Sequence, residues 1–223
     1  MTPVPSVAKP SSVKPVIVAV VLAAGQSSRF GADKRVATID GDQTVLQRTL
    51  HNLYPAVDQV LVVLKPQDRG CETLLLGKYA DVPRITLCYA AHAAEGLSGS
   101  IRDAMRFLAE QRQDALGAVL IALADMPFVR ADTIDAVIQR WDPDKIVRPR
   151  YQAAPGGSAL QPGTESTIPG HPVLFGARWI PQLSQCQGDS GAKFVLQTNP
   201  QAVVDVIVDD AGILRDIDRP NDL

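Results

Sequence analysis

Stretches of uninterrupted apolar residues alternate along this chain with stretches in which apolar residues recur every three or four positions. Continuous β-branched and aliphatic runs predict fully buried strands, and they cover residues 16–23, 60–64, 84–90 and 118–124. Helical spacing predicts helices over residues 44–53, 71–79, 98–111 and 132–141, the last with Asp132 as its N-cap. Predicted strands and helices therefore alternate with the spacing that is typical of βαβ units.

This alternation predicts a single α/β domain with a mostly parallel sheet that helices cover on both faces. After residues 145–150 the pattern loosens, and residues 152–169, rich in Gly, Pro, Ser and Thr, predict a long flexible loop. Segments at 172–175 and 202–208, a short helix at 190–197 and a strand end at 216–217 complete the domain. Residues 1–14 contain prolines, serines and two lysines and predict a disordered leader before a domain over 15–223.

Composition restricts the partners. The chain has 223 residues and a formal net charge of −2, so bulk electrostatics give no case for nucleic acid or an anionic membrane. No apolar run approaches the roughly 18–20 residues that span a bilayer, and no apolar signal region follows a charged start, which predicts a cytoplasmic protein. Cys71, Cys88 and Cys186 are odd in number and far apart, which argues against a disulfide framework and a cysteine-based zinc site.

The first predicted strand ends abruptly in a loop that can wrap a polyphosphate. Residues 20–34 read V-V-L-A-A-G-Q-S-S-R-F-G-A-D-K. Backbone N–H groups and cations in such a loop offset the charge of a phosphate ligand. Gly25 and Gly31 are six positions apart with no glycine between them, which excludes the dinucleotide fingerprint. Lys34 comes three residues after Gly31 and precedes Arg35, which excludes the P-loop.

The remaining pattern, L-A-A-G-x-S-x-R-F-G-x-D-K, resembles the signature loop of the nucleotidyltransferases that build activated sugars, alcohols and molybdopterin dinucleotides. The resemblance implies the Rossmann-like three-layer sandwich of the nucleotide-diphospho-sugar transferases. It also implies that Arg29 and Lys34 hold the phosphates of an NTP as catalytic cations. The residues that would lie along the nucleotide are Leu22, Ala23, Ala24 and Gly25. The alternative interpretation is a solvated basic turn after a strand.

A carboxylate stands where the fourth predicted strand ends. Asp125 follows the apolar run L-I-A-L-A at residues 120–124, and open α/β sheets bind ligands at the carboxyl ends of their strands. An Asp there can tether Mg²⁺ to a triphosphate, or simply turn the chain before Pro127. The segment D-M-P-F resembles the D-x-P-F element of the same family, which implies that Asp125 is a catalytic metal ligand.

The last eight residues carry a second candidate carboxylate. Residues 216–223, D-I-D-R-P-N-D-L, resemble the D-I-D-x-P-x-D-L ending of these enzymes, which implies that Asp218 is a further metal ligand. Asp218 is equally well placed to cap a helical turn that begins at Pro220. The two interpretations stay open.

Residues 96–102, G-L-S-G-S-I-R, resemble the G-M-x-x-S-L-R element of the molybdenum cofactor cytidylyltransferases. The resemblance implies that Gly96, Ser98 and Ser100 contact the nucleotide through N–H groups and hydroxyls, although Ser98 is also a plain N-cap candidate. Leu97, Gly99 and Ile101 depart from the usual element, and Ala32-Asp33-Lys34 also suits guanylyltransferases.

Two later segments resemble the same branch on the acceptor side. Residues 170–175, G-H-P-V-L-F, imply that His171 faces the acceptor, or else that the histidine is structural. Residues 188–193, G-D-S-G-A-K, imply that Asp189 and Gly191 line the acceptor pocket. His51 and His92 receive no role.

The sequence thus predicts a molybdenum cofactor cytidylyltransferase that uses Mg²⁺, with CTP and a molybdopterin-type acceptor as substrates and a client molybdoenzyme or its chaperone as a partner. A terminal phosphate oxygen of the acceptor would attack the α-phosphorus in line and release pyrophosphate. Three alternatives stay open. In the first, the chain would transfer GMP from GTP to the same cofactor. In the second, it would transfer CMP to a small sugar or polyol phosphate. In the third, it would be a nucleotide-binding chaperone that delivers the cofactor without catalysing a reaction.

Overall fold

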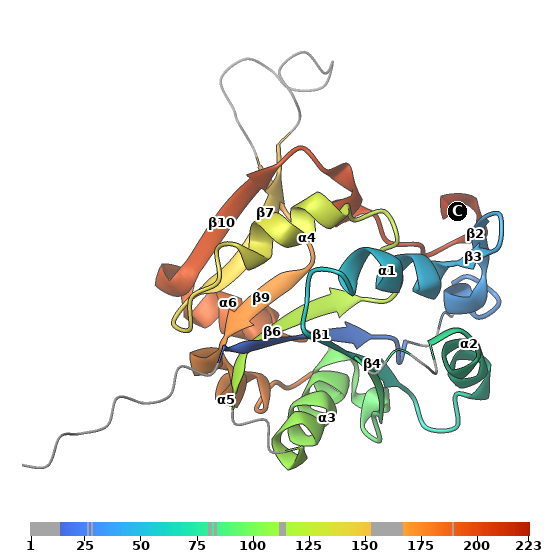
Figure 1. Cartoon of the computed structure of the whole chain (residues 1–223), viewed down its shortest axis with the longest axis horizontal. Coiled ribbons are helices and arrows are strands. Elements are labelled where there is room, and N and C mark those ends of the chain that lie inside the picture. The colour runs from blue at the N-terminus through green and yellow to red at the C-terminus, as the bar shows by residue number, and fades with distance from the viewer. Residues whose placement is uncertain are drawn as a thin grey trace, which may run out of the picture.

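The central feature of the fold is one sheet of eight strands. The computed structural model of the chain describes residues 14–25, 27, 29–79, 82, 84–111, 115–152, 167–188 and 190–223 (Figure 1). The strands lie in the order β10-β7-β9-β6-β1-β4-β5, and β8 pairs with β7. Their bounds are β1 (Val16–Leu22), β4 (Gln59–Leu64), β5 (Ile85–Tyr89), β6 (Leu116–Leu123), β7 (Ile146–Tyr151), β8 (Ile168–Pro169), β9 (Val173–Gly176) and β10 (Val203–Val208). A small separate hairpin joins β2 (Thr38–Asp40) to β3 (Gln43–Thr44).

The sheet is mostly parallel, as predicted. β1 is parallel to both neighbours, β4 and β6, and the pairs β4–β5 and β7–β10 are parallel as well. β9 runs antiparallel to β6 and to β7, and β8 runs antiparallel to β7. The carboxyl ends of the six parallel strands therefore meet at one edge, together with the start of β9.

Helices cover both faces of the sheet, which confirms the predicted three-layer sandwich. Alternate residues of β1 belong to two separate cores: Ala19 and Val21 pack with α1, α2 and α4, whereas Val18 and Val20 pack with α3, α5 and α6. Figure 1 shows α1 and α4 in front of the strands. The helices are α1 (Val45–Leu53), α2 (Arg69–Tyr79), α3 (Leu97–Glu110), α4 (Ala131–Ile138), α5 (Ile180–Leu183) and α6 (Lys193–Thr198).

Two helix starts show different ways of capping. α1 begins with a local capping box, in which Thr44 and Gln47 each accept the other's backbone N–H. The prediction that Asp132 caps α4 is wrong, because the N-cap position is Arg130. The buried Asp210 serves this helix start instead, since it accepts from the Arg130 N–H at 2.8 Å and from the Thr133 hydroxyl at 2.7 Å. A cap that comes from 80 residues away leaves no trace in the local pattern.

Other predicted elements are present with small shifts at their ends, and two details are wrong. Residues 168 and 169 belong to β8 rather than to a loop, and residues 216 and 217 belong to no strand. Lys14, placed in the predicted leader, forms an exposed ion pair with Asp58 at 3.4 Å. Residues 1–13 of that leader and 153–166 of the predicted loop lie outside the described residues.

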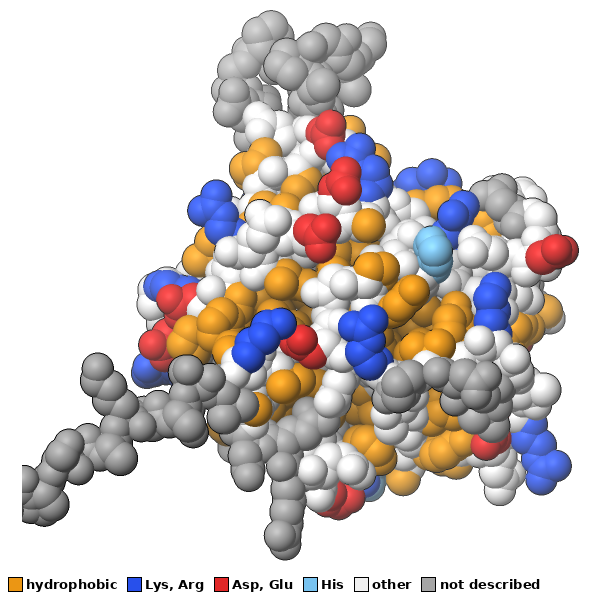
Figure 2. Space-filling model, in the orientation of Figure 1, with side chains coloured by type: hydrophobic (Ala, Val, Ile, Leu, Met, Phe, Trp, Pro, Cys, Tyr) orange, Lys and Arg blue, Asp and Glu red, His pale blue; other side chains and the backbone are white. Residues whose placement is uncertain are grey.

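The surface agrees with the near-neutral composition. On the described part of the face in Figure 2, basic and acidic side chains are interspersed among hydrophobic ones rather than gathered into one charged region. Within the described ranges, no helix combines the length and the apolar character that crossing a bilayer requires.

Candidate active site

A cleft opens at the carboxyl ends of β1 and β6, next to the start of α3. The loop after β1 forms one wall, and the 3-10 turn η2 (Ala93–Glu95) with Gly96 forms another. This loop cleft has a volume of about 490 Å³. The predicted metal ligand Asp125 lines it, as do most residues predicted to hold the nucleotide, namely Leu22, Ala23, Ala24, Gly25, Lys34, Gly96 and Ser100. A Cβ at Gly25 would meet no atom within 4 Å, so the glycine leaves open space where a ligand can approach.

The two predicted phosphate cations contact carboxylates. Lys34 Nζ lies 2.7 Å from Asp125 Oδ2 and 3.0 Å from Asp218 Oδ1, and Arg29 Nη1 donates to Asp218 Oδ2 at 2.8 Å. The Lys34 side chain is only 12% exposed, whereas that of Arg29 is 73% exposed at the rim. Asp218 therefore does not cap the terminal turn η6 (Pro220–Asp222): its carboxylate accepts from the two cations, and the N-cap position is Arg219.

Three carboxylates converge beside Lys34. Asp125, Asp216 and Asp218 each offer an oxygen, and these oxygens lie within 4.8 Å of one another. A backbone hydrogen bond of 2.9 Å from Ile217 N–H to Asp125 O fixes the C-terminal segment next to the end of β6. Carboxylate oxygens are the ligands that Mg²⁺ prefers, so this carboxylate cluster fits a divalent ion. Asp216 was not predicted as a ligand, although it stands in the D-I-D motif that drew attention to Asp218.

Lys34 and Asp218 each stabilise the charged form of the other. Burial alone would lower the pKa of Lys34, but hydrogen bonds and attraction from Asp125 and Asp218 outweigh it and raise that pKa above its usual value. Hydrogen bonds from Lys34 and Arg29 lower the pKa of Asp218. The amine and the carboxylate are therefore both charged at neutral pH.

Arg35, which sequence reasoning did not select, lines the loop cleft and supports the signature loop. It is 3% exposed, and its guanidinium donates to the carbonyl of Ala23, to Asp33 at 2.6 and 2.8 Å and to Asp68 at 2.5 Å. Burial raises the pKa of Cys71, which lies beneath this group, to about 12, so the thiol stays protonated. The cluster of Asp33, Asp68 and Cys71 thus surrounds an arginine, which forms an ion pair with each of the two carboxylates.

The start of α3 differs from the prediction at one residue. Ser98 is not the N-cap, because that position is Gly96, whose φ of 82° lies in the left-handed region that favours glycine. The Ser98 side chain is fully buried and its hydroxyl has no hydrogen-bond partner among the described residues. It does not line the loop cleft, whereas Gly96 and Ser100 do.

A second cavity of about 310 Å³ adjoins the loop cleft and shares Leu22, Leu97 and Leu123 with it. This apolar pocket has mostly hydrophobic walls, including Ile101, Ile121, Val173, Phe175 and Leu196. Polar groups stand among them: Arg148, His171, Ser190 and Lys193. His171 and Gly191, which the sequence predicted to face the acceptor, both line this pocket, whereas Asp189 lies outside the described residues. Arg148 was not predicted, and it is held by Asp205 at 2.6 Å.

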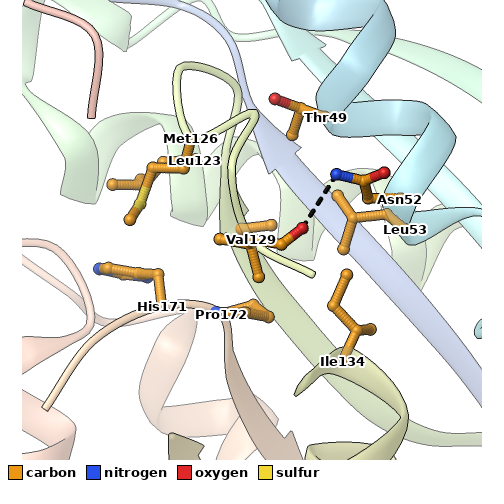
Figure 3. A pocket seen from close by; sticks show the side chains of 10 residues that line it. Thr49, Asn52, Leu53, Leu123, Met126, Val129, Ile134, His171 and Pro172 are labelled. Carbon is orange, nitrogen blue, oxygen red and sulfur yellow. Dashed lines mark hydrogen bonds between the residues drawn. The ribbon is translucent and has the colours of Figure 1, made fainter. Parts of the chain in front are cut away.

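His171 lies between the apolar pocket and a much smaller cavity. That cavity, of about 10 Å³, is enclosed by α1, α4 and the end of β6, and Figure 3 shows the His171 ring beside Met126 and Pro172 at its border. Burial lowers the pKa of His171, and its Nδ1 has no partner within the described chain. The imidazole is therefore neutral at physiological pH, which suits a polar wall group better than a phosphate-binding cation.

Comparison with known proteins gives one family over most of the chain. The model of the MobA-like NTP transferase domain matches residues 19–203. Purine catabolism protein PucB of Bacillus subtilis (strain 168) is 25% identical over 213 residues, which cover 93% of this chain and 94% of PucB. A probable molybdenum cofactor guanylyltransferase of Methanosarcina acetivorans is 31% identical over 145 residues, or 60% of this chain and 61% of that protein.

A third relative is named a cytidylyltransferase rather than a guanylyltransferase. The 2-C-methyl-D-erythritol 4-phosphate cytidylyltransferase of Aeromonas hydrophila is 34% identical over 125 residues, which are 50% of this chain and 51% of its own. Among solved structures, Rv0371c from Mycobacterium tuberculosis H37Rv superposes with a TM-score of 0.70 at 24% identity, covering 94% of this chain and 96% of its own. The same protein in complex with manganese gives 0.67 at 22% identity, with 93% and 95% covered. These structures show the fold.

Proposed function

The chain belongs to the MobA-like NTP transferase family, and from this premise we propose that it transfers CMP from CTP to the terminal phosphate of a molybdopterin-type acceptor, releasing pyrophosphate. It is a nucleotidyltransferase of the MobA-like type, and the proposal concerns its two substrates. The observation that carries the proposal is the pair of adjoining cavities. One is lined by cations and carboxylates, and the other is apolar with two cationic side chains.

The loop cleft suits the NTP. Small residues on both walls leave room for a nucleoside, and Lys34 and Arg29 stand where a triphosphate would extend toward the carboxylate cluster. On nucleotide binding these cations would exchange Asp125 and Asp218 for phosphate oxygens, which carry more charge. Fixed cations neutralise the charge that grows on departing pyrophosphate, and such preorganised electrostatics is a large part of phosphoryl-transfer catalysis.

The apolar pocket supports a planar heterocyclic acceptor over a polyol. Aliphatic and aromatic walls would leave most hydroxyls of a polyol without hydrogen-bond partners, which is unfavourable, whereas a ring system buries its faces against them and needs partners only at its edge, where the pocket offers Arg148, His171, Ser190 and Lys193. Arg148 and Lys193 at the pocket can pair with the acceptor's phosphate. The pocket's shared border with the loop cleft would then bring that phosphate toward the α-phosphorus.

The reaction needs no covalent enzyme intermediate. An oxygen of the acceptor phosphate forms the new bond to the α-phosphorus, and the bond from that phosphorus to the bridging oxygen breaks, so that pyrophosphate leaves with its electron pair. Residues of this chain bind and align the two substrates, and alignment by itself gives large rate gains. The carboxylate cluster would hold Mg²⁺, which when bound neutralises charge on the phosphate oxygens.

GTP is the second candidate donor, and one observation favours it. The relative from Methanosarcina acetivorans is named a probable molybdenum cofactor guanylyltransferase and is 31% identical to this chain. The segments over 96–102 and 170–175 favour CTP, because both resemble the cytidylyltransferase branch. The two donors use the same chemistry and differ only in the base.

Pyrophosphate release tests the proposal. We expect the purified protein to release pyrophosphate only with CTP, Mg²⁺ and molybdopterin together. Release that requires GTP supports the guanylyltransferase alternative, and release with CTP and a polyol phosphate overturns the assigned acceptor. The Asp125→Asn variant should lose at least 100-fold in turnover. Asp135→Asn, the same change at an exposed position of α4, should not. No release with any NTP would leave the chaperone alternative.

A further inference from the structure

One wall of the loop cleft is a short turn whose cleft-lining residues offer a ligand only backbone polar groups. Ala93, Ala94 and Gly96 line the cleft and have no polar side-chain atoms, so their N–H and C=O groups are their polar contribution. Backbone groups read a ligand well only when the turn is fixed, because ordering a mobile turn on binding costs affinity. The question is what fixes this turn.

Asp103, in the middle of α3, contacts the first residue of the turn. The His92 backbone N–H donates to Asp103 Oδ2 at 2.8 Å, and His92 Nδ1 lies 2.9 Å from Asp103 Oδ1. Arg106 donates to the same Oδ1 at 2.8 Å from the opposite side. Asp103 is 3% exposed, an unusual position for a carboxylate unless it is paired.

The charge state of this carboxylate is secure. Burial would raise the pKa of Asp103, but the hydrogen bonds from His92 and the electrostatic attraction of His92 and Arg106 outweigh it and lower that pKa. An ionised carboxylate only accepts hydrogen bonds, so the His92 ring donates from Nδ1. Asp103 therefore holds both the backbone and the side chain of His92.

Two further contacts tie the same turn to α3. A Cβ on Gly99 would lie 1.9 Å from the His92 carbonyl oxygen, so the helix and the turn approach as closely as a glycine allows. Arg102, one helical position before Asp103, donates to the carboxylate of Glu95 and to the carbonyl of Cys186. The turn is thus held at His92 and at Glu95, on either side of the two alanines that face the cleft.

We propose that Asp103 is a positioning residue for the nucleotide, which fixes the wall at Ala93 and Ala94 by clamping His92. This inference rests on the proposed function for the identity of the ligand, a nucleoside triphosphate. Asp103 does not line the loop cleft, so it acts through the turn rather than by contact with substrate. Its role is to keep the base-facing backbone in one conformation before the nucleotide arrives.

Three variants of the full chain test the clamp. Asp103→Asn keeps the shape of the side chain but removes its charge and one acceptor site. His92→Ala removes only the ring contact, at a side chain that is 46% exposed and thus safe for folding. Arg106→Ala is the matched control, because Arg106 binds the same carboxylate from a side chain that is 57% exposed, away from the turn.

Hydrogen–deuterium exchange and steady-state kinetics give independent results. In Asp103→Asn we expect faster exchange over residues 92–97, with unchanged exchange over β4 as the internal reference. We also expect KM for the nucleotide to rise about tenfold, the value of roughly one charged hydrogen bond, with kcat within threefold. His92→Ala should shift both quantities in the same direction by less, and Arg106→Ala should leave both unchanged.

Unchanged exchange over residues 92–97 in Asp103→Asn would overturn the proposal. So would equal effects of Arg106→Ala and Asp103→Asn, because these would indicate general destabilisation, and so would a fall in kcat at constant KM. The exchange measurement needs no substrate. If the protein transfers no nucleotide at all, the proposed function fails while the clamp itself is still decided.

Discussion

Replacing Lys34 by methionine should change metal binding and catalysis in opposite directions. Without nucleotide, the amine lies 2.7 Å from Asp125 and 3.0 Å from Asp218, two of the three oxygen donors of the carboxylate cluster. A divalent ion that binds alone must displace this amine. Lys34→Met removes the competitor and leaves three carboxylates, of which Asp218 keeps its ion pair with Arg29. The ion should therefore bind the variant more tightly, although turnover collapses.

The size of the effect follows from the two contacts. Asp218 is 37% exposed and Asp125 is 22% exposed, so both ion pairs are partly screened and each is worth about 0.5–1 kcal/mol. Two such contacts make about 1–2 kcal/mol, which corresponds to a roughly 5- to 30-fold tighter dissociation constant for the ion. Turnover should fall by at least 100-fold, since the leaving pyrophosphate loses a fixed cation.

Titration of the nucleotide-free protein with Mn²⁺, followed by electron paramagnetic resonance of the free ion, measures this directly. Lys78→Met, at the exposed end of α2, controls for the loss of one positive charge far from the site. If Lys34→Met binds Mn²⁺ with the same or lower affinity than the parent protein, then the amine does not compete for these carboxylates.

Three further results are expected. Asp216→Asn should weaken Mn²⁺ binding about tenfold in the same titration, because it removes one of three charged donors, and unchanged affinity would exclude Asp216 as a ligand. Gly99→Ala should lower the free energy of unfolding by about 1–3 kcal/mol in urea titrations, since the new methyl group overlaps the His92 carbonyl, whereas Gly77→Ala, which meets no atom, should stabilise or be neutral. The lowered pKa of Asp103 stabilises the fold above the unfolded-state pKa of about 4, and this contribution is lost as pH falls through the folded pKa, so the stability difference between parent and Asp103→Asn should shrink below about pH 4. A difference that stays constant from pH 6 to pH 3 would contradict this.

Sequence patterns predicted the parts of the site that are continuous in the chain or follow from the topology of the sheet. The loop over 22–34 is one segment with a recognisable spacing of glycines and cations. Asp125 could be placed because it follows a buried strand, and parallel strands bring their carboxyl ends to one edge. Both features line the loop cleft in the structure.

The parts that escaped prediction depend on partners far away in the chain. Asp103 lies among the apolar positions of a helix, where a carboxylate normally indicates the exposed face. It is buried because the His92 N–H and ring satisfy it from the preceding turn. Arg35 and Asp210 are similar cases. Each is buried and forms hydrogen bonds with residues that are distant in the chain: Arg35 with Asp68, 33 residues away, and Asp210 with Arg130, 80 residues away. Local periodicity records which face of a helix is apolar, but it does not record which polar group will find a partner there.

The reversed direction of β9 has a consequence for how this enzyme type can diversify. A strand parallel to β6 would place at the reactive edge only the residues that follow its C-terminal end. β9 instead places at this edge the residues that precede its N-terminal end, because Val173 pairs with Ile121 near the end of β6. Gly170 and His171 thus belong to a connection that leaves this edge after β7 and returns to it. Under the proposed function, lengthening or rewriting that connection would alter the acceptor pocket and leave the cations and carboxylates of the loop cleft untouched. Acceptor choice and transfer chemistry would then depend on separate stretches of the chain.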